Sequence, residues 1–378
     1  MVALKTRGRA EGVRDTILGP VSWGSVSPGG VQLVRAGSPA PRPVSGVAAT
    51  LAEEGVDTAL ITGPRVLGLR SVDHLDEGDI VAVHPSGIVE TLFRVRSTNN
   101  ALFVTDRCNS NCLMCSQPPR DVDDVDRLDA VNRRLVPLVP KETEVLGITG
   151  GEPTLLGGRL IRLIGLLRDE LPETAVHMLT NGRAFAWPHV ARSLAGVEHP
   201  RLVLGVPLYA DHAALHDYVV QARDAFAQTV LGLHNLGRYE VGVEVRVVLH
   251  ALTVPRLPEL AEFVFRHLPF AEHVAFMGLE YTGYTPHNGG LLWAEPDKFA
   301  GPLEEAVGYL AGFGMNVSVY NLQHCLLPRS LWPFAKPSIS AWKREYLPAC
   351  DGCAVKGECG GVFGTSKRHS ESIRPVES

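Results

Sequence analysis

Three cysteines lie close together in the first third of the chain. Cys108, Cys112 and Cys115 are spaced CxxxCxxC and follow a short apolar run. Thiolates bind zinc and iron–sulfur clusters, and closed sites of both kinds use four protein ligands. The next cysteine in the sequence is Cys325, so this loop provides only three ligands. A cluster held there keeps one iron open, and an open position is typical of a catalytic metal site.

A glycine-rich segment, GGEPT at 150–154, begins 35 residues after Cys115 and also follows an apolar run. Gly150 and Gly151 allow the backbone to approach a ligand closely. The carboxylate of Glu152 and nearby carbonyl groups can accept hydrogen bonds from an ammonium group. The segment therefore predicts a ligand-binding loop, although GGEP alone is also compatible with a plain structural turn.

Together, the CxxxCxxC loop after one strand and GGEPT after the next resemble the radical S-adenosylmethionine (SAM) enzymes. The resemblance implies a [4Fe-4S] cluster on the three cysteines, SAM chelated to the open iron, and an external one-electron reductant. It also implies cleavage of SAM to a 5′-deoxyadenosyl radical that abstracts a hydrogen atom from substrate. The SAM contacts that it assigns in these two loops are Met114, Gly150, Gly151, Glu152 and Pro153.

Two further positions follow from the same resemblance. Asn181 corresponds to a ribose contact, although asparagine also tolerates the left-handed turn conformation. Pro207 replaces a serine that often helps to bind the SAM carboxylate. We expect Arg246 to supply that contact instead, with pairing to Glu244 or exposure to solvent as the alternatives.

Other polar residues near the expected strand ends could orient a substrate or transfer protons. A structural residue in the rim or the core is the alternative for each of them. They are Tyr209, Asp211, His212, His250 and Glu280.

A second group of four cysteines lies near the end of the chain, with the spacing C-x24-C-x2-C-x5-C. Four thiolates can close a site for Zn²⁺ or for a [4Fe-4S] cluster, and on the ligand set alone zinc is favoured. Peptide-modifying radical SAM enzymes often carry such a C-terminal extension with extra clusters, so the resemblance implies one auxiliary [4Fe-4S] cluster here. Its ligands would be Cys325, Cys350, Cys353 and Cys359.

A more specific resemblance rests on three segments, 103–119, 321–361 and the SIRP sequence at 372–375. These resemble the radical SAM maturase (C component) of the His-Xaa-Ser repeat system. The resemblance implies that a ribosomally made precursor peptide is modified or cross-linked, alongside a second radical SAM maturase. Radical chemistry on a small molecule or nucleoside precursor is one alternative, and a non-catalytic iron–sulfur or zinc scaffold is another.

Apolar runs alternate with amphipathic helices between residues 98 and 322, which predicts an α/β fold with a parallel sheet. Six such repeats predict a partial (β/α)6 TIM-type barrel, open at the side. Residues 1–97 are expected to form a β-rich domain that could dock the precursor, and 323–378 the auxiliary cluster domain. The strands predicted for the central part are 102–105, 145–149, 175–179, 201–208, 241–249 and 273–280, and its helices are 158–171, 187–194, 222–236 and 257–267.

The composition of the 378-residue chain is that of an ordinary globular protein. A net charge of −5 gives no reason to expect a nucleic-acid partner. The sequence contains neither an apolar run long enough for a membrane span nor a secretory signal. We therefore expect a cytoplasmic location without membrane attachment, where cysteines stay reduced and serve as metal ligands.

Overall fold

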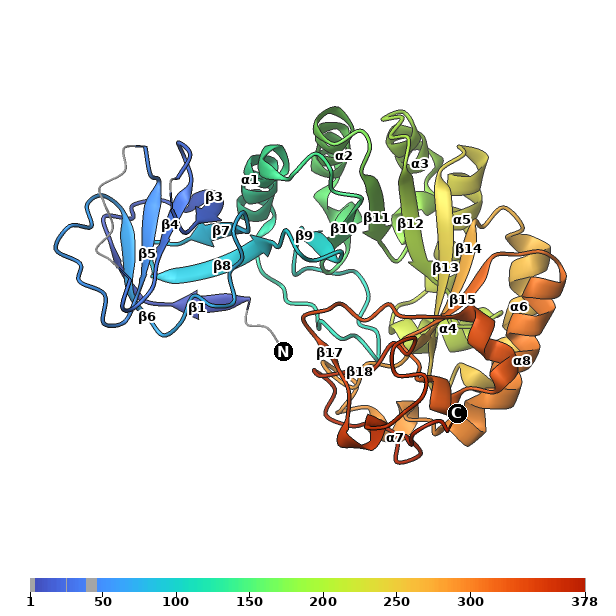
Figure 1. The fold of residues 1–378 in the computed structure, drawn as a ribbon. Helices are drawn as coiled ribbons and strands as arrows, with labels where there is room; N and C mark the ends of the chain where they lie inside the picture. The colour runs from blue at the N-terminus through green and yellow to red at the C-terminus, as the bar shows by residue number, and fades with distance from the viewer. Residues whose placement is uncertain (1–3, 25, 39–45, 378) are drawn as a thin grey trace.

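The computed structural model describes residues 4–24, 26–38 and 46–377. They form two eight-stranded sheets and one short two-stranded sheet (Figure 1). No helix in these residues is long and apolar enough to cross a membrane.

The first sheet occupies the N-terminal part of the chain and has the order β1-β8-β7-β3-β4-β5-β6-β2. Its two outermost strands, β1 and β2, are separated only by Gly8, so this sheet closes on itself. The interior is filled by buried valine and leucine side chains. The strands are β1 (Lys5–Arg7), β2 (Arg9–Glu11), β3 (Ile17–Ser22), β4 (Val31–Val34), β5 (Ala49–Glu53), β6 (Arg65–Leu69), β7 (Ile80–Val83) and β8 (Ile88–Phe93).

Strands β7 and β8 form an antiparallel hairpin around a turn at Gly87. Residues 58–61 form no strand, although they lie in the β-rich part of the chain. Asp57 Oδ1 accepts the Ala59 N–H at 3.0 Å, and Ile61 N–H donates to the Thr58 carbonyl, so this segment is a turn. Such local hydrogen bonds compete with strand pairing.

The second sheet is parallel throughout and runs from β9 to β16 in sequence order. The six predicted strands correspond to β9–β14, which confirms the α/β class with a parallel sheet, and β15 and β16 extend the sheet to eight. These last two strands have only four and two residues, too few for a clear apolar pattern. The strands are β9 (Asn100–Phe103), β10 (Val145–Thr149), β11 (Ala175–Leu179), β12 (Leu202–Pro207), β13 (Gly242–Leu249), β14 (His273–Gly278), β15 (Val317–Tyr320) and β16 (Ala335–Lys336).

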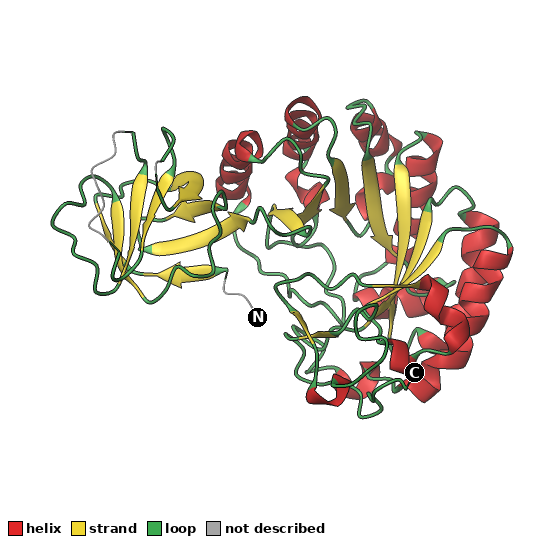
Figure 2. Ribbon diagram, viewed as in Figure 1, coloured by secondary structure: helices red, strands yellow, loops and turns green. Residues whose placement is uncertain are grey.

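Helices cover the outer side of this second sheet (Figure 2). The four predicted helices correspond to α2, α3, α5 and α6, whereas α1, α4, α7 and α8 were not predicted. Helix α1 has a polar sequence, and two of its three buried residues are Asp129 and Asn132. The helices are α1 (Val125–Leu135), α2 (Gly158–Glu170), α3 (Pro188–Ala195), α4 (Ala213–Val220), α5 (Ala225–Arg238), α6 (Leu257–His267), α7 (Gly289–Leu292) and α8 (Pro296–Gly312).

The C-terminal segment lies on the other side of the second sheet from most of these helices (Figure 1). It contains little regular structure apart from an antiparallel pair, β17 (Arg344–Glu345) and β18 (Val362–Phe363). Its Gln323 Nε2 donates to the Gly361 carbonyl at 2.7 Å, which joins the end of the sheet to this pair.

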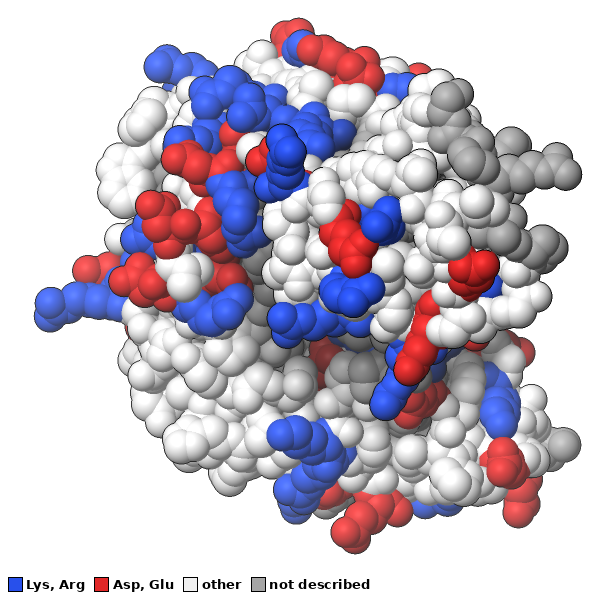
Figure 3. Space-filling model, turned by 90° about the vertical axis from the view of Figure 1, so that its left-hand side faces the viewer, with Lys and Arg blue, Asp and Glu red and all other residues white. Residues whose placement is uncertain are grey.

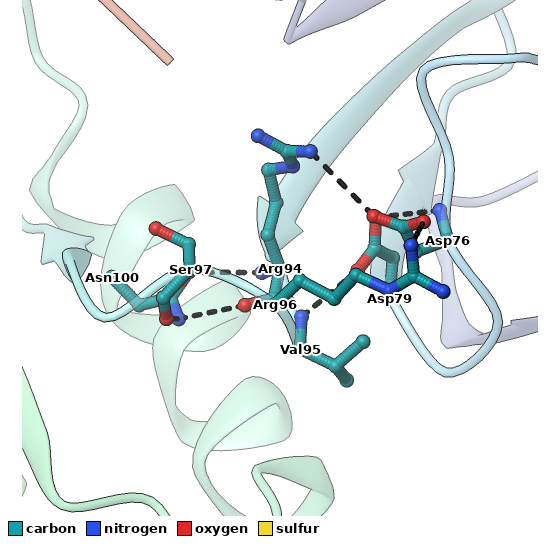
Figure 4. A network of polar contacts seen from close by, with 7 residues as sticks. All are labelled: Asp76, Asp79, Arg94, Val95, Arg96, Ser97 and Asn100. Carbon is teal, nitrogen blue, oxygen red and sulfur yellow. Dashed lines mark hydrogen bonds and ion pairs between the residues drawn. The ribbon is translucent and has the colours of Figure 1, made fainter. Parts of the chain in front are cut away.

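A network of polar contacts joins the two large sheets where β8 leads into β9 (Figure 4). The fully buried Asp79 accepts the backbone N–H groups of Val95, at 2.9 Å, and of Asp76, at 3.0 Å. Asn100 exchanges hydrogen bonds with the backbone N–H and carbonyl of Arg94, both at 2.9 Å. These side chains fix the connecting segment with hydrogen bonds, next to a buried apolar cluster that Ile80 and Phe93 share with Leu102.

We expect Asp79→Ala to lower the free energy of unfolding by about 2 kcal/mol, because two backbone amides lose their acceptor. Urea denaturation followed by circular dichroism measures this loss. The matched control is Asp73→Ala, since Asp73 pairs with Arg35 while its side chain is 72% exposed. That change should cost less than about 0.5 kcal/mol. Equal losses in both variants would contradict the role given to Asp79.

Candidate functional site

The loop that carries the first three cysteines is held by two other segments. The N–H groups of Asn111 and Leu113 donate to the carbonyls of Val220 and Val219 at the end of α4, at 3.0 and 2.9 Å. On the other side, Tyr284 N–H donates to the Cys115 carbonyl at 2.9 Å. These bonds fix the path of the cysteine loop from outside.

The three cysteines line one pocket at the ends of strands β9 to β14, with a volume of about 1210 Å³ that is open to solvent. Active sites of β/α folds lie at this end of the strands. Predicted residues that line the pocket are Cys108, Met114, Cys112, Cys115, Gly150, Gly151, Glu152, Asn181, Tyr209, Arg246 and Glu280.

Burial raises the pKa of the Cys108 thiol to about 11 and that of Cys112 to about 12. The neighbouring thiols, including Cys115, and the Glu152 carboxylate add to these shifts. The protein alone therefore keeps the thiols protonated, whereas metal ligation requires thiolates. The three thiols fit a cationic metal centre, because its binding would displace their protons. Among the described residues, no three His, Cys, Asp or Glu side chains form a group suited to a single metal ion.

The GGEPT loop packs directly against the cysteine loop. Gly151 N–H donates to the Thr105 carbonyl at 2.7 Å, and Glu152 N–H donates to the Arg107 carbonyl at 2.8 Å. A Cβ atom on Gly151 would lie 1.9 Å from the Arg107 carbonyl oxygen, which is impossible without moving one loop. The sequence predicts that Gly150 and Gly151 allow a close approach to a ligand. In the structure, Gly151 also allows a close approach to the backbone of the cysteine loop.

The Glu152 carboxylate is almost fully buried and serves as an internal acceptor. Its Oε1 accepts from the backbone and hydroxyl of Thr154, at 3.0 and 2.6 Å, and from the Thr180 hydroxyl at 2.6 Å. Its Oε2 accepts the Asn181 N–H at 2.7 Å. The carboxylate therefore ties the end of β10 to the end of β11. Pro153 is buried behind it at the start of a short 3-10 turn.

Asn181 does not have the left-handed backbone that the sequence allowed as an alternative. The positive φ of this turn belongs to Gly182, at 77°, and Asn181 is not among the described residues with positive φ. Its Nδ2 donates to Asn109 Oδ1 in the cysteine loop at 2.6 Å, and its Oδ1 accepts the Arg183 N–H. The side chain is therefore held at the pocket wall.

Arg246 forms the ion pair with Glu244 that the sequence left open, with 2.5 Å between Nη1 and Oε1. Glu244 also contacts His273 Nδ1 at 2.7 Å and His177 Nε2 at 3.4 Å. Burial alone would raise the pKa of Glu244, but the two histidines and Arg246 hold this pKa well below its usual range. Because Gly205 has no side chain, Arg246 has room here; a Cβ atom would lie 2.9 Å from Arg246 Cδ.

The five residues expected to orient a substrate have different surroundings. Tyr209 and Glu280 line the pocket, and Glu280 accepts from Lys343 Nζ, at 3.0 Å, and from the Thr365 hydroxyl. Glu280 is thus bound to the C-terminal segment.

The other three of these residues do not line the cysteine pocket. Asp211 pairs with Arg256, and His212 accepts the Leu215 N–H at the start of α4. His250 is fully buried, burial lowers its pKa to about 3, and neither ring nitrogen has a hydrogen-bond partner among the described residues. The expectation that His250 contacts a substrate is therefore not supported, because its ring cannot be reached.

The four late cysteines are half-buried in the C-terminal segment. Burial raises the pKa of Cys325, and the nearby thiols of Cys359 and Cys350 raise it further. The Cys353 thiol accepts the Val376 N–H at 3.4 Å. The fold thus brings Cys325, Cys350 and Cys359 near one another, and the end of the chain contacts the fourth.

Sequence reasoning missed several polar residues that support the site. His177 lies inside β11, His273 is the first residue of β14, and Lys343 lies next to β17. Each is a single polar residue far from the others in sequence, so no spacing pattern marks them. The only signal is a histidine within each of the predicted strands 175–179 and 273–280, and Lys343 has none.

Residues 102–264 match the family described as the Radical SAM superfamily. A comparison with curated protein sequences gives no match. Among solved structures, this chain is similar to SuiB of Streptococcus suis bound to S-adenosylmethionine, with 13% identity and a TM-score of 0.47 over 59% of this chain and 50% of SuiB. It is also similar to anSMEcpe with bound AdoMet, with 16% identity and a TM-score of 0.44 over 58% of this chain and 62% of that one. The chain thus spans about half the length of SuiB.

We expect Gly151→Ala to prevent assembly of a metal centre on the three cysteines, because the added Cβ separates the two loops that form the pocket. The measurement is iron content per chain after anaerobic reconstitution, together with the melting temperature. Gly165→Ala on α2 is the control, since a Cβ there meets no atom within 4 Å. Normal iron content in the Gly151 variant would contradict the tight loop contact.

Proposed function

We propose that this chain, an enzyme with a radical SAM superfamily domain at residues 102–264, is a maturase that acts on a ribosomally made precursor peptide of the His-Xaa-Ser type. The observation that carries the proposal is the shared pocket of Cys108, Cys112, Cys115 and the GGEPT loop. The late cysteines and the resemblance of segments 103–119 and 321–361 favour a peptide substrate.

The radical SAM domain implies a [4Fe-4S] cluster and SAM as cofactors. When both are bound, one external electron breaks a C–S bond of SAM to give methionine and a 5′-deoxyadenosyl radical, which takes a hydrogen atom from the substrate. The residues that would hold the cluster are Cys108, Cys112 and Cys115.

Residues around the pocket would bind and orient SAM. The backbone carbonyls of Gly150 and Gly151 are acceptors for its ammonium group, since the Glu152 carboxylate already accepts four hydrogen bonds. Arg246 has donors left for the SAM carboxylate, because the Glu244 contact uses only one of its nitrogens. Asn181 would contact the ribose, and Met114 would cover the adenine edge.

The wider organisation belongs to the same proposal. The parallel sheet would act as a partial barrel from 98 to 322, and 323–378 would hold one auxiliary [4Fe-4S] cluster on Cys325, Cys350, Cys353 and Cys359. Residues 1–97 would form a separate β-rich domain. A cytoplasmic location, an external one-electron reductant and a second radical SAM maturase as partner complete the proposal.

The experiment that tests the function is co-expression of the chain with a His-Xaa-Ser precursor, followed by mass spectrometry of the precursor. A mass change that requires intact Cys112 is the expected result. Cleavage of SAM by the reduced enzyme without any change in the precursor would instead support a small-molecule or nucleoside substrate. Absence of SAM cleavage would support a non-catalytic scaffold.

Metal analysis separates the two cysteine groups. We expect about eight irons per chain after anaerobic reconstitution, because two four-iron clusters are proposed. Cys112→Ala should leave about four irons and abolish SAM cleavage, whereas Cys350→Ala combined with Cys353→Ala should leave about four irons on the first site. About four irons and one zinc in the unchanged protein would remove the auxiliary cluster from the proposal.

We expect Glu244→Gln to weaken SAM binding about tenfold without changing iron content, because Arg246 loses the partner that orients it. Equilibrium binding of SAM to the reconstituted enzyme measures the effect. Glu262→Gln is the control, since Glu262 pairs with Arg266 on the exposed side of α6. Unchanged affinity in the Glu244 variant would show that Arg246 does not bind the SAM carboxylate.

A further inference from the structure

Strand β9 lies at one end of the parallel sheet and pairs only with β10 among the described residues. Val104 N–H donates to the Thr149 carbonyl, so by the alternation of a parallel ladder the backbone groups of Leu102 also face β10. The backbone groups of Ala101 and Phe103 must then face away from the sheet. The Phe103 carbonyl accepts Asn132 Nδ2 at 2.9 Å, which fits this orientation.

The outer edge of β9 is free where Ala101 lies. Its side chain is exposed, and its N–H and carbonyl have no hydrogen-bond partner in the described part of the chain. An open strand edge is a template for pairing with another extended chain. The hairpin of β7 and β8 offers no such edge at its paired positions, because β7 also pairs with β3 and β8 also pairs with β1.

A groove of about 1090 Å³ runs along this free edge. Its lining includes Leu128 and Val131 of α1, Ala82 and Leu92 of the N-terminal sheet, and Ala101 of β9. The groove is therefore formed jointly by the two large sheets and α1, and it combines apolar side chains with polar ones such as His84, Thr91 and Asn132.

The groove lies next to the cysteine pocket. Gln117 lines both cavities and follows Cys115 by two residues. A chain that occupies the groove is therefore close to the place where hydrogen abstraction is proposed.

Charges at the groove indicate what kind of chain it accepts. Lys5 pairs with Glu90 at 2.9 Å and Arg120 pairs with Asp106 at 2.5 Å, so these four residues neutralise one another. Arg127 lines the groove, is exposed and has no ion-pair partner among the described residues. On the face seen from the N-terminal sheet, basic side chains generally lie close to acidic ones (Figure 3). An unpaired arginine is thus a place for an acidic residue of a partner.

We propose that an extended segment of the peptide substrate adds to β9 as a further strand, next to Ala101, with an acidic side chain at Arg127. Main-chain hydrogen bonds hold the peptide in such strand addition, and side-chain contacts set its register. This inference rests on the peptide substrate of the proposed function and specifies where the peptide docks.

The test uses the full-length reconstituted enzyme and the co-expressed His-Xaa-Ser precursor as the probe. Ala101→Pro removes the outward N–H but no hydrogen bond to β10, because the N–H of this residue does not face the sheet. We expect the dissociation constant of the precursor, measured by calorimetry, to be at least tenfold higher for Ala101→Pro than for the unchanged enzyme. Iron content and SAM cleavage should be unchanged. Ala101→Ser keeps the N–H and should bind the precursor within twofold of the unchanged enzyme.

A second variant tests the charge. Arg127→Glu should weaken precursor binding several-fold, and the loss should shrink as salt concentration rises, since exposed charges are screened. A third test changes the peptide instead of the enzyme. A precursor with an N-methylated backbone in its docking segment should bind weakly to the unchanged enzyme. Its affinity should equal that of the unmodified precursor for Ala101→Pro.

The outcomes separate this inference from the proposed function. If the precursor is modified and Ala101→Pro binds it with unchanged affinity, docking at β9 is wrong while the function stands. If Ala101→Pro instead abolishes self-association in sedimentation and leaves precursor binding intact, the edge serves a second copy of the chain and the inference is also wrong. If the unchanged enzyme cleaves SAM but binds no precursor, the peptide substrate itself fails.

Discussion

The buried carboxylate of Glu152 is the interaction on which the arrangement of the pocket depends. The carboxylate oxygens accept hydrogen bonds from Thr154, Thr180 and the Asn181 backbone. The backbone N–H of Glu152 donates to the Arg107 carbonyl in the cysteine loop. One residue thus connects the ends of β9, β10 and β11. A carboxylate with so many donors is stable when buried, because the hydrogen bonds compensate for its lost hydration.

The inner face of the parallel sheet carries a second polar network, centred on Glu244. A carboxylate among His177, His273 and Arg246 remains ionised and keeps the guanidinium in a fixed position. Buried ion pairs of this kind contribute little net stability, since the desolvation of both charges opposes their attraction. The network instead orients Arg246 toward the pocket.

A continuous set of contacts joins the C-terminal segment to the first cysteine loop. Lys343 binds Glu280, and the Ser366 hydroxyl accepts the Tyr281 N–H at 2.9 Å. A few residues further on, Gly283 lies so close to the Cys115 carbonyl that a Cβ there would be 2.2 Å from its oxygen. The segment 280–284 therefore contacts both the C-terminal segment that carries the late cysteines and the cysteine pocket.

The sequence by itself determined the parallel α/β core and the two cysteine groups, because strand periodicity and short-range spacing are local properties. It also placed GGEPT and the triad at successive strand ends, and both line the pocket. Only the tertiary structure decided that His250 is buried, that Gly182 rather than Asn181 takes the positive φ, and that Glu244 gathers two distant histidines. The tertiary structure also decided that no described strand pairs with the outer edge of β9. These features depend on which strands and helices become neighbours, and contacts between residues far apart in sequence leave no local pattern from which to predict them.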